Sequence, residues 1–176
     1  MAKKTSSPKK AKKTSSPKKA EEILMGKPGY FKLSDKKKKS SRPSKGYFKL
    51  FPAEKRNIRI AFAKAKPLKK PVHSQAYDLI HTKSKIDFSD IHDIERKIED
   101  ITFIEVKSTK DKNRDAKFTG HFFGVSVNEM IMAQDHVKQY KFVFVNVKHK
   151  YILEMDLPMF FTRIKQQWHT FSFRLN

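Results

Sequence analysis

Two charged residues, Glu105 and Lys107, lie in the middle of an otherwise apolar stretch, residues 100–109 (DITFIEVKST). β-Branched and aromatic residues dominate this stretch and a polar run follows it, which predicts a β-strand. Because successive side chains of a strand point to opposite faces, Glu105 and Lys107 are expected side by side on one face. An unpaired buried charge is costly, so the two residues must be paired, solvated or bound to a metal ion.

Two interpretations of this pair remain open from the residues alone. The first is a half-exposed edge strand that carries a cross-strand ion pair. The second is a nuclease site, in which a carboxylate on a strand holds a divalent metal ion and the lysine two residues later lies beside the attacking water. The nuclease interpretation needs a further acidic side chain near Glu105.

Asp78 is the predicted second acid. It lies in residues 75–80 (QAYDLI), which are expected to form a short strand, and a carboxylate inside an apolar strand needs a compensating charge such as a metal ion. Asp93 and Asp100 are the competing acids. Their neighbours are polar, so solvation explains these two carboxylates without a metal.

The charge of the chain is large and unevenly distributed. The 176 residues carry a formal net charge of +22, and residues 1–56, with 17 Lys and 2 Arg against 4 acidic residues, account for +15 of it. A basic arm ahead of a moderately basic domain is typical of a polyanion binder, and nucleic acid is the commonest such partner. The arm has no long apolar face for lipid and no apolar run has the length of a membrane span, so no membrane partner is expected.

The sequence also indicates a compartment. It contains no cysteine, which excludes disulfides and cysteine-based zinc sites and fits a reducing environment. The first residues lack the apolar core of a secretion signal. We therefore expect an intracellular protein that is nuclear or otherwise associated with DNA.

The arm contains a tandem repeat. Residues 2–10 and 11–19 are both AKKTSSPKK. Because the arm is highly charged and poor in large apolar residues, we predict that residues 1–56 are disordered. The SPKK units resemble the repeats of linker-histone tails, which implies contact with the minor groove of DNA. The arm residues expected to contact phosphates are Lys9, Lys10, Lys18, Lys19, Lys36, Lys37, Lys38 and Lys39.

A second repeat, GYFKL, occurs at residues 29–33 and 46–50. Each copy places two adjacent aromatic residues and a leucine next to lysines. Base stacking, docking of a partner and a small strand packed on the domain all remain open. Duplication within a lysine-rich linker favours a tether over a core segment. A module for RNA or partner binding built on this repeat is one alternative function.

The ordered domain is predicted at residues 57–176, with a mixed α/β layout. Residues 58–65 are expected to form a strand or a short helix, and residues 82–99 a polar insertion with one helical turn. A helix with Asn128 as its N-cap should run to about Gln139 and cross over between two central strands. The expected strands are residues 75–80, 101–108, 120–127, 140–147 and 150–156.

These segments together resemble the PD-(D/E)XK nuclease superfamily and, more narrowly, its NO VEIN C-terminal domain subgroup. The resemblance covers residues 75–150 and implies a restriction-endonuclease-like mixed central sheet with a flanking helix. One departure is that Asp78 lies 27 residues before Glu105, across an insertion, where the subgroup has a tight hairpin. The matching motifs are YDLI, FIEVKST, FFGVSVNEMIMAQ and YKFVFVNV.

The resemblance implies that Asp78 and Glu105 bind Mg²⁺ or Mn²⁺, with the Val106 carbonyl as a further oxygen ligand. Lys107 would position the attacking water and stabilise developing negative charge. For Glu129, two roles remain open: assistance to the metal-bound water or Lys107, and stabilisation of the helix N-terminus. Contacts of the domain with nucleic acid are expected from the insertion and from the loop residues Lys110, Lys112 and Arg114.

The sequence therefore predicts a metal-dependent DNA endonuclease of restriction or repair type, held on DNA by its basic arm. The alternative is a non-catalytic DNA-binding or packaging protein on a degenerate nuclease fold, and the intact Asp78, Glu105 and Lys107 favour the enzyme. DNA is the expected partner. A homodimer is expected if both strands are cut, because one such site cuts one strand.

Overall fold

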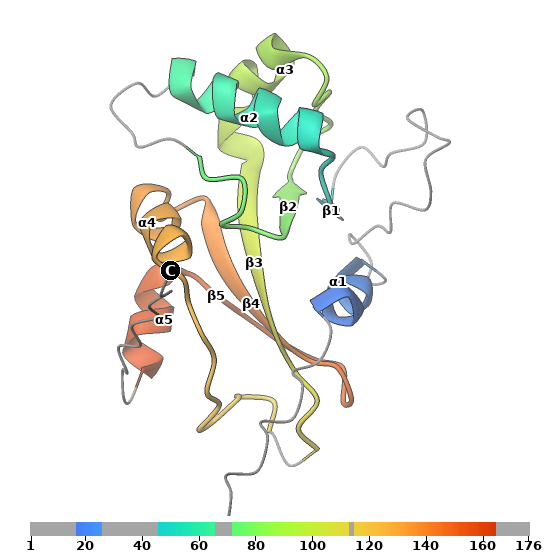
Figure 1. Cartoon of the computed structure of the whole chain (residues 1–176), viewed down its shortest axis with the longest axis vertical. Coiled ribbons are helices and arrows are strands. Elements are labelled where there is room, and N and C mark those ends of the chain that lie inside the picture. The colour runs from blue at the N-terminus through green and yellow to red at the C-terminus, as the bar shows by residue number, and fades with distance from the viewer. Residues whose placement is uncertain (1–16, 26–45, 66–71, 113–114, 165–176) are drawn as a thin grey trace, which may run out of the picture.

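A five-stranded mixed sheet with five flanking α-helices forms the domain in the computed structural model (Figure 1), which describes residues 17–25, 46–65, 72–112 and 115–164. The strands, which lie in the sheet in chain order, are β1 (Gly46–Phe48), β2 (Leu79–Thr82), β3 (Ile101–Thr109), β4 (Tyr140–Asn146) and β5 (Tyr151–Met155). The helices are α1 (Pro17–Met25), α2 (Pro52–Ala65), α3 (Ile91–Arg96), α4 (Val127–Asp135), α5 (Leu157–Arg163) and a 3₁₀ turn η2 (Ile98–Asp100). The predicted mixed α/β fold is confirmed.

β3 is the central strand, and its two edges are paired differently. It is antiparallel to β2, with Leu79 opposite Ile104, and parallel to β4, with Glu105 opposite Phe142. A parallel neighbour requires a crossover connection, and α4 lies within that connection, as the sequence predicted. The first half of β3 is therefore flanked by strands on both sides, whereas from Glu105 onward β3 is paired with β4 and no longer with β2.

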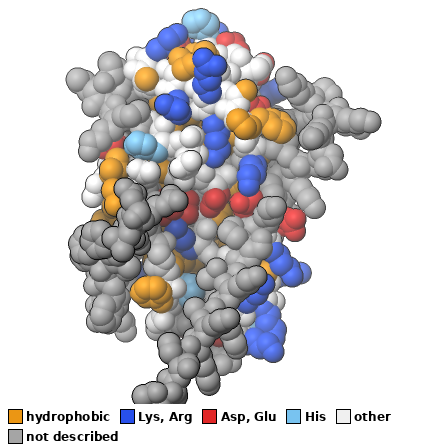
Figure 2. Space-filling view, viewed as in Figure 1, with side chains coloured by type: hydrophobic (Ala, Val, Ile, Leu, Met, Phe, Trp, Pro, Cys, Tyr) orange, Lys and Arg blue, Asp and Glu red, His pale blue; other side chains and the backbone are white. Residues whose placement is uncertain are grey.

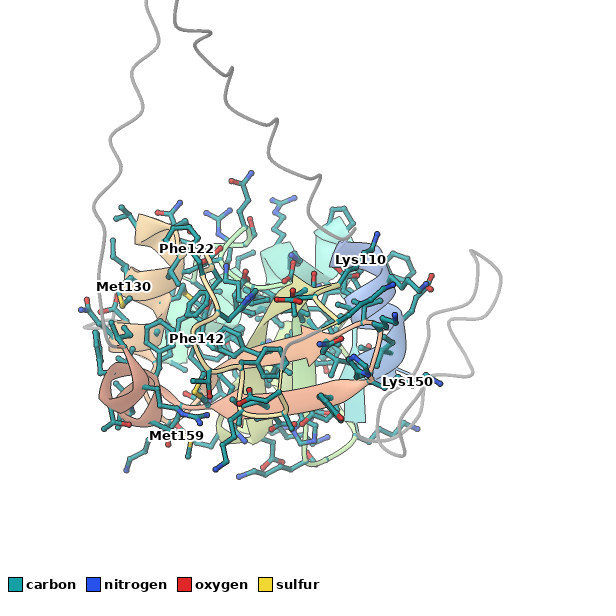
Figure 3. The ribbon with its side chains drawn as sticks, turned by 90° about the horizontal axis from the view of Figure 1, so that it is seen from below. Lys110, Phe122, Met130, Phe142, Lys150 and Met159 are labelled. Atoms are coloured by element: carbon teal, nitrogen blue, oxygen red, sulfur yellow. The ribbon has the colours of Figure 1, made fainter. Side chains whose placement is uncertain are left out.

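The two faces of the sheet carry separate apolar cores. On one face, Phe103, Phe142 and Phe144 pack with residues of α2, α3, α4 and α5. On the other face, Ile104, Val106, Val143 and Val145 pack under α1 through Ala20 and Leu24. Figure 3 shows α1 on one side of the sheet and the α4–α5 pair on the other. The alternation of β3 thus assigns Glu105 and Lys107, with Phe103, to the face with more helices.

The structured domain extends beyond the predicted boundary at residue 57. α1 lies within the segment assigned to the disordered arm, and Ala20 and Leu24, one helical turn apart, are fully buried against the sheet. β1 and the first turn of α2 also precede residue 57. The reason is that a short amphipathic segment can bury its few apolar side chains even where the average composition is highly charged. Residues 1–16 and 26–45 lie outside the described residues.

The second GYFKL copy is a strand and not a tether. It contributes β1, and Phe48 is 4% exposed in the core beneath α2 and α3. The Tyr47 hydroxyl donates a hydrogen bond to Glu154. Of the alternatives left open by the sequence, the small strand packed on the domain is correct for this copy, while the first copy falls outside the described residues.

Residues 58–65 are helical, which is one of the two alternatives that the sequence left open, and form the second half of α2. Two other predicted elements differ in the structure. Residues 120–127 form no strand. In this segment Phe123 packs on Phe144, with ring centroids 4.6 Å apart. The alternation of apolar and polar residues that suggested a strand therefore reflects packing of this segment on the core. The crossover helix has Ser126 as its N-cap in place of Asn128, and ends at Asp135. Within the described residues, no helix combines the length and apolarity needed to cross a membrane.

Candidate active site

Glu105 and Lys107 lie in the middle of β3, and both are largely withdrawn from solvent. Their side chains retain 8% and 13% exposure, and the Lys107 Nζ donates to the Glu105 Oε1 at 2.8 Å. The aromatic side chains of Phe142 and Phe144 on β4 lie opposite them in the register. A carboxylate and an ammonium are therefore held next to an apolar core, in an environment that strengthens electrostatic interactions.

Asp78 lies directly before β2, at the point where the pairing of β2 with β3 ends. Its backbone N–H donates to the Ile104 carbonyl at 2.9 Å, and its Oδ2 accepts from the Val106 N–H at 2.9 Å. Asp78 is one register position beyond the Leu79–Ile104 pair, which places it opposite Glu105. Residues opposed in this way have Cβ atoms about 5 Å apart. Two acids that are distant in sequence thus meet in the sheet.

The Val106 carbonyl points toward the same side of β3 as its N–H, because both backbone groups of a strand residue project to one edge. That N–H binds the Asp78 carboxylate, so the carbonyl also faces the β2 edge, where the Asp78 loop lies. The Val106 carbonyl, which is predicted to be an oxygen ligand, therefore lies at the same edge of β3 as the Asp78 carboxylate.

Both carboxyl groups have raised pKa values. Burial raises the pKa of Asp78 and the charge of Glu21 adds to this, although the Val106 N–H opposes the effect by binding the ionised form. Burial raises the pKa of Glu105 to about 8, and the charge of Asp78 contributes in the same direction. Neighbouring buried carboxyl groups with raised pKa values are a feature of metal and catalytic sites.

Lys107 is held between two carboxylates. Its Nζ contacts Glu129 Oε2 at 2.7 Å as well as Glu105 Oε1 at 2.8 Å. Burial acts to lower the pKa of Lys107, but the charges and hydrogen bonds of Glu105 and Glu129 outweigh it, so the pKa is raised. The ammonium is therefore fixed in position and stays protonated. Two of its three N–H donors are used by these carboxylates.

Glu129 makes two contacts, one that suits each of the roles that the sequence left open. Its Oε2 accepts from the Ser126 N–H at 3.0 Å while the Ser126 Oγ accepts from the Glu129 N–H at 3.2 Å, which forms a capping box at the start of α4. The same Oε2 contacts Lys107. Glu129 thus couples the start of the crossover helix to the centre of β3.

Two residues that the sequence did not single out hold the Asp78 loop. The Tyr140 hydroxyl donates to the Ala76 carbonyl at 2.6 Å, and the Lys55 Nζ donates to the Ser74 carbonyl at 2.7 Å and the Tyr77 carbonyl at 3.3 Å. The sequence contained a sign of the role of Tyr140, since this residue carries a hydroxyl group at the start of the most apolar strand. The sequence contained no such sign for Lys55, because it is one lysine among many in a basic segment.

The competing acids lie elsewhere and have other partners. Asp93 is buried in the insertion, where it accepts hydrogen bonds from the Asp87 N–H and from Lys97. These bonds lower the pKa of Asp93, so it is paired rather than solvated as the sequence suggested. Asp100 accepts from the Ser84 hydroxyl at the start of β3. It lies five residues, roughly 17 Å along a strand, from Glu105.

The residues predicted to contact nucleic acid are only partly described. Lys110 and Lys112 are exposed at the far end of β3, Lys19 is exposed on α1, and Lys18 lies in α1. Figure 2 shows acidic side chains near the middle of one face with Lys and Arg side chains above and below them. Outside the described residues are Lys9, Lys10, Lys36, Lys37, Lys38, Lys39 and Arg114.

The donor set fits a hard divalent cation with few protein ligands. Within the described ranges, no group of three or more His, Cys, Asp or Glu side chains is arranged to hold a metal ion. Asp78 and Glu105 instead offer two carboxylates, with the Val106 carbonyl beside them. Mg²⁺ commonly binds through one or two carboxylates and keeps several waters, so such a set suits it and the similar Mn²⁺.

The comparisons with known proteins give one family match. Residues 53–153, more than half of the chain, match the model of the family described as protein NO VEIN, C-terminal. The match spans α2 to β5 and so includes the Asp78 loop, β3 and the start of α4. No curated protein and no solved structure matches the chain.

Proposed function

The chain belongs to the family of the NO VEIN C-terminal domain, and on the geometry of its site we propose that it is a metal-dependent DNA endonuclease of the PD-(D/E)XK type. The observation that carries this proposal is the meeting of Asp78 and Glu105 across the β2–β3 pair, with Lys107 two residues further on the same face. A restriction or repair enzyme would need this combination of two acids and a lysine.

Asp78 and Glu105 are the residues that would hold Mg²⁺ or Mn²⁺, together with the Val106 carbonyl. The raised pKa values of both carboxyl groups support this assignment, because burial disfavours their ionised forms and a bound cation would favour them. When bound, such an ion supplies Lewis-acid activation of a water and offsets charge that builds on the phosphate.

Lys107 supplies the fixed positive charge of the proposed mechanism. With two of its N–H donors bound by Glu105 and Glu129, the third is left to orient an attacking water or to contact a phosphate oxygen. A donor that is fixed before the reaction stabilises developing negative charge without reorganisation. Glu129 is the positioning residue that holds this donor in place.

Nucleic acid is the substrate class that the charge supports. The formal net charge of +22 gives strong attraction for a polyanion at low salt, and Lys and Arg side chains lie above and below the acidic side chains on the face seen in Figure 2. DNA is favoured over RNA by the SPKK repeats of residues 1–19, which resemble a DNA-binding tail.

A second candidate function is supported by the closed network around Lys107. Because Glu105 and Glu129 both contact its ammonium, the three residues also form a satisfied ion cluster that could be purely structural. In that case the protein would bind or package DNA without cutting it, on a degenerate nuclease fold.

The experiment that separates the two functions is incubation of the full chain with supercoiled plasmid in Mg²⁺, in Mn²⁺ and in EDTA. The proposed nuclease nicks or linearises the plasmid in either metal and not in EDTA. The ratio of nicked to linear product distinguishes a single-strand cutter from a double-strand cutter, which needs two sites and hence a homodimer. Retarded but intact plasmid under every condition would support the packaging function.

A further inference from the structure

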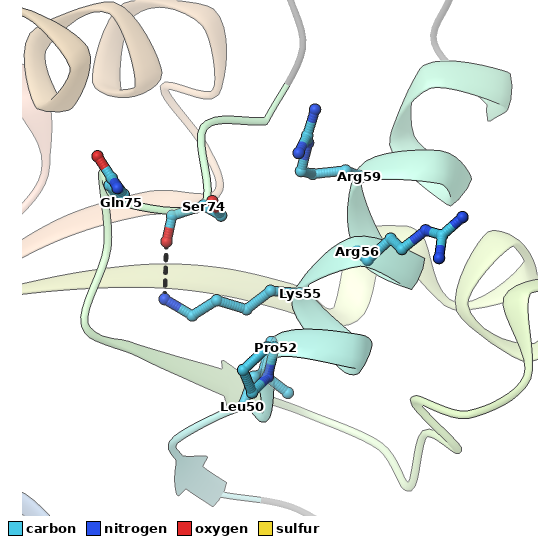
Figure 4. Close-up of a pocket in the computed structure, with 7 residues that line it drawn as sticks. All are labelled: Leu50, Pro52, Lys55, Arg56, Arg59, Ser74 and Gln75. Carbon is cyan, nitrogen blue, oxygen red and sulfur yellow. Dashed lines mark hydrogen bonds between the residues drawn. The ribbon is translucent and has the colours of Figure 1, made fainter.

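A basic cavity beside α2 shares Lys55 and Ser74 with the contacts that hold the Asp78 loop. It has a volume of 340 Å³ and lies between the first half of α2 and the loop that leads to Asp78 (Figure 4). Three of its residues are cations and none is acidic. The lining residues are Leu50, Pro52, Lys55, Arg56, Arg59, Ser74 and Gln75.

The three cations come from adjacent positions on one helix. Lys55 and Arg59 are four residues apart and Arg56 and Arg59 are three apart, so their side chains project from neighbouring parts of the α2 surface. Arg56 and Arg59 are exposed, and neither forms a salt bridge with another residue of the described part of the chain. Both guanidinium groups are therefore available to an anion from solvent.

Lys55 joins this cavity to the proposed active site. Its Nζ donates to the Ser74 carbonyl across the cavity, as Figure 4 shows, and lies 4.4 Å from the centre of the Tyr77 ring. Tyr77 immediately precedes Asp78, and the charge of Asp78 acts on the Lys55 ammonium. The cavity is therefore next to the acid that ends the β2–β3 pairing.

We propose that this cavity is a phosphate-binding subsite, in which Arg56 and Arg59 bind a backbone phosphate of the nucleic acid strand next to the phosphate that is cut. The identification of the neighbouring phosphate as the one cut rests on the proposed nuclease function; the binding of a backbone phosphate does not. Guanidinium groups bind phosphate oxygens in pairs of parallel hydrogen bonds, which a lysine cannot do. The fixed ammonium of Lys55 adds positive charge at the wall nearest Asp78.

The test compares two double variants of the full chain that lose the same charge. Arg56→Ala/Arg59→Ala removes the exposed cations of the cavity, while Lys64→Ala/Lys138→Ala removes exposed cations from the end of α2 and from the turn after α4. Binding of a short fluorescent DNA duplex is measured by anisotropy over a range of salt concentrations, in EDTA to prevent cleavage. Alanine is the best helix former, so neither variant should disturb α2.

The subsite predicts that the arginine variant reduces the slope of log K against log salt by about one, the amount expected when one phosphate is no longer neutralised by the protein. It also predicts that this variant weakens binding roughly tenfold or more at low salt, and that the lysine variant leaves the slope unchanged. Equal slopes for the two variants would overturn the subsite.

Failure of the subsite and failure of the nuclease proposal are distinguishable. A wild-type chain that never cuts plasmid, but whose binding weakens specifically when Arg56 and Arg59 are replaced, would support the cavity as a nucleic acid site while removing the enzyme. A chain that cuts plasmid but shows the same salt slope in both variants would keep the enzyme and remove the subsite.

Discussion

The Asp78 carboxylate accepts a hydrogen bond from the Val106 N–H at 2.9 Å, at the position where β2 separates from β3. This bond continues the ladder between the strands with a side chain in place of a backbone carbonyl. The position of Asp78 is consequently set by the sheet and not by the length of the connection. The insertion between β2 and β3, which departs from the tight hairpin of the related subgroup, therefore leaves the acid opposite Glu105.

Replacing Lys107 by alanine should abolish cleavage while leaving DNA affinity nearly unchanged. Removal of a fixed donor to the reacting phosphate is expected to lower the rate by roughly a hundredfold or more. The free energy of unfolding should also fall, by about 3 kcal/mol, because Glu105 and Glu129 lose their shared cation. Cleavage rate, duplex affinity and thermal denaturation are measured together.

Lys97→Ala is the matched control for this change. It breaks the ion pair of Lys97 with the buried Asp93, at 2.9 Å, in the insertion and away from the site. Lys97→Ala should lower the free energy of unfolding and leave the cleavage rate unchanged. A folded Lys107→Ala variant that still cuts DNA would remove Lys107 from the mechanism.

The two roles of Glu129 can be separated by substitution. Glu129→Gln keeps an oxygen for the Ser126 N–H but removes the negative charge from Lys107, so kcat should fall with little change in melting temperature. Ser126→Ala removes the acceptor of the Glu129 N–H, so stability should fall by about 1 kcal/mol with kcat unchanged. If Glu129→Gln changes only the melting temperature, Glu129 is a helix cap and nothing more.

The metal-free protein should become less stable as the pH rises from about 4.5 to about 8. In the unfolded chain Glu105 ionises near the ordinary value of 4.5, whereas burial raises its pKa to about 8 in the folded chain. Between these values the unfolded state loses its proton and the folded state keeps it. The free energy of unfolding therefore falls by up to about 1.4 kcal/mol per pH unit through this group.

Glu105→Gln should flatten this fall and raise the melting temperature at pH 8, while the exposed control Glu99→Gln should not. Thermal denaturation across the pH range, in EDTA, measures the effect. An identical pH dependence in wild type and Glu105→Gln would show that Glu105 ionises normally in the folded chain.

Deletions from the N-terminus should separate DNA binding from folding. Removal of residues 1–16 takes away six lysines, so the salt slope of DNA binding should decrease by about 0.9 for each phosphate that these lysines neutralise, with no change in melting temperature. Removal of residues 1–25 also deletes α1 and uncovers the apolar face beneath Ala20 and Leu24. Stability should then fall by about 2 to 4 kcal/mol. Equal salt slopes before and after the shorter deletion would exclude this segment from DNA binding.

The central strands were predictable because their sequences satisfy burial and propensity at once. β3 and β4 are apolar, β-branched and buried, and their observed bounds lie within one residue of the predicted ones. Residues 120–127 misled the prediction, because Phe123 and Val125 alternate toward the core without pairing in the sheet. α1 was missed because its two buried apolar residues, Ala20 and Leu24, are few among the charged residues around them.

The residues of the candidate site could be identified from their types and spacing. Their arrangement in space could not. Glu105 and Lys107 followed from the period of a strand, whereas Asp78 was chosen as a residue within a strand and in fact precedes β2. The contact of Lys107 with Glu129 required the crossover of α4, which spacing in the sequence does not specify. The contribution of Lys55 depends on a loop fold for which the sequence holds no signal.

Mn²⁺ binding to the full chain, followed by electron paramagnetic resonance at pH 8, tests the metal centre most directly. Wild type is compared with Asp78→Asn/Glu105→Gln and with the exposed control Glu99→Gln. We predict a single Mn²⁺ ion bound per chain in the wild type and the control, displaced by excess Mg²⁺, and none in the double variant. Absence of bound Mn²⁺ in the wild type, or equal binding in the double variant, would contradict a metal centre at Asp78 and Glu105.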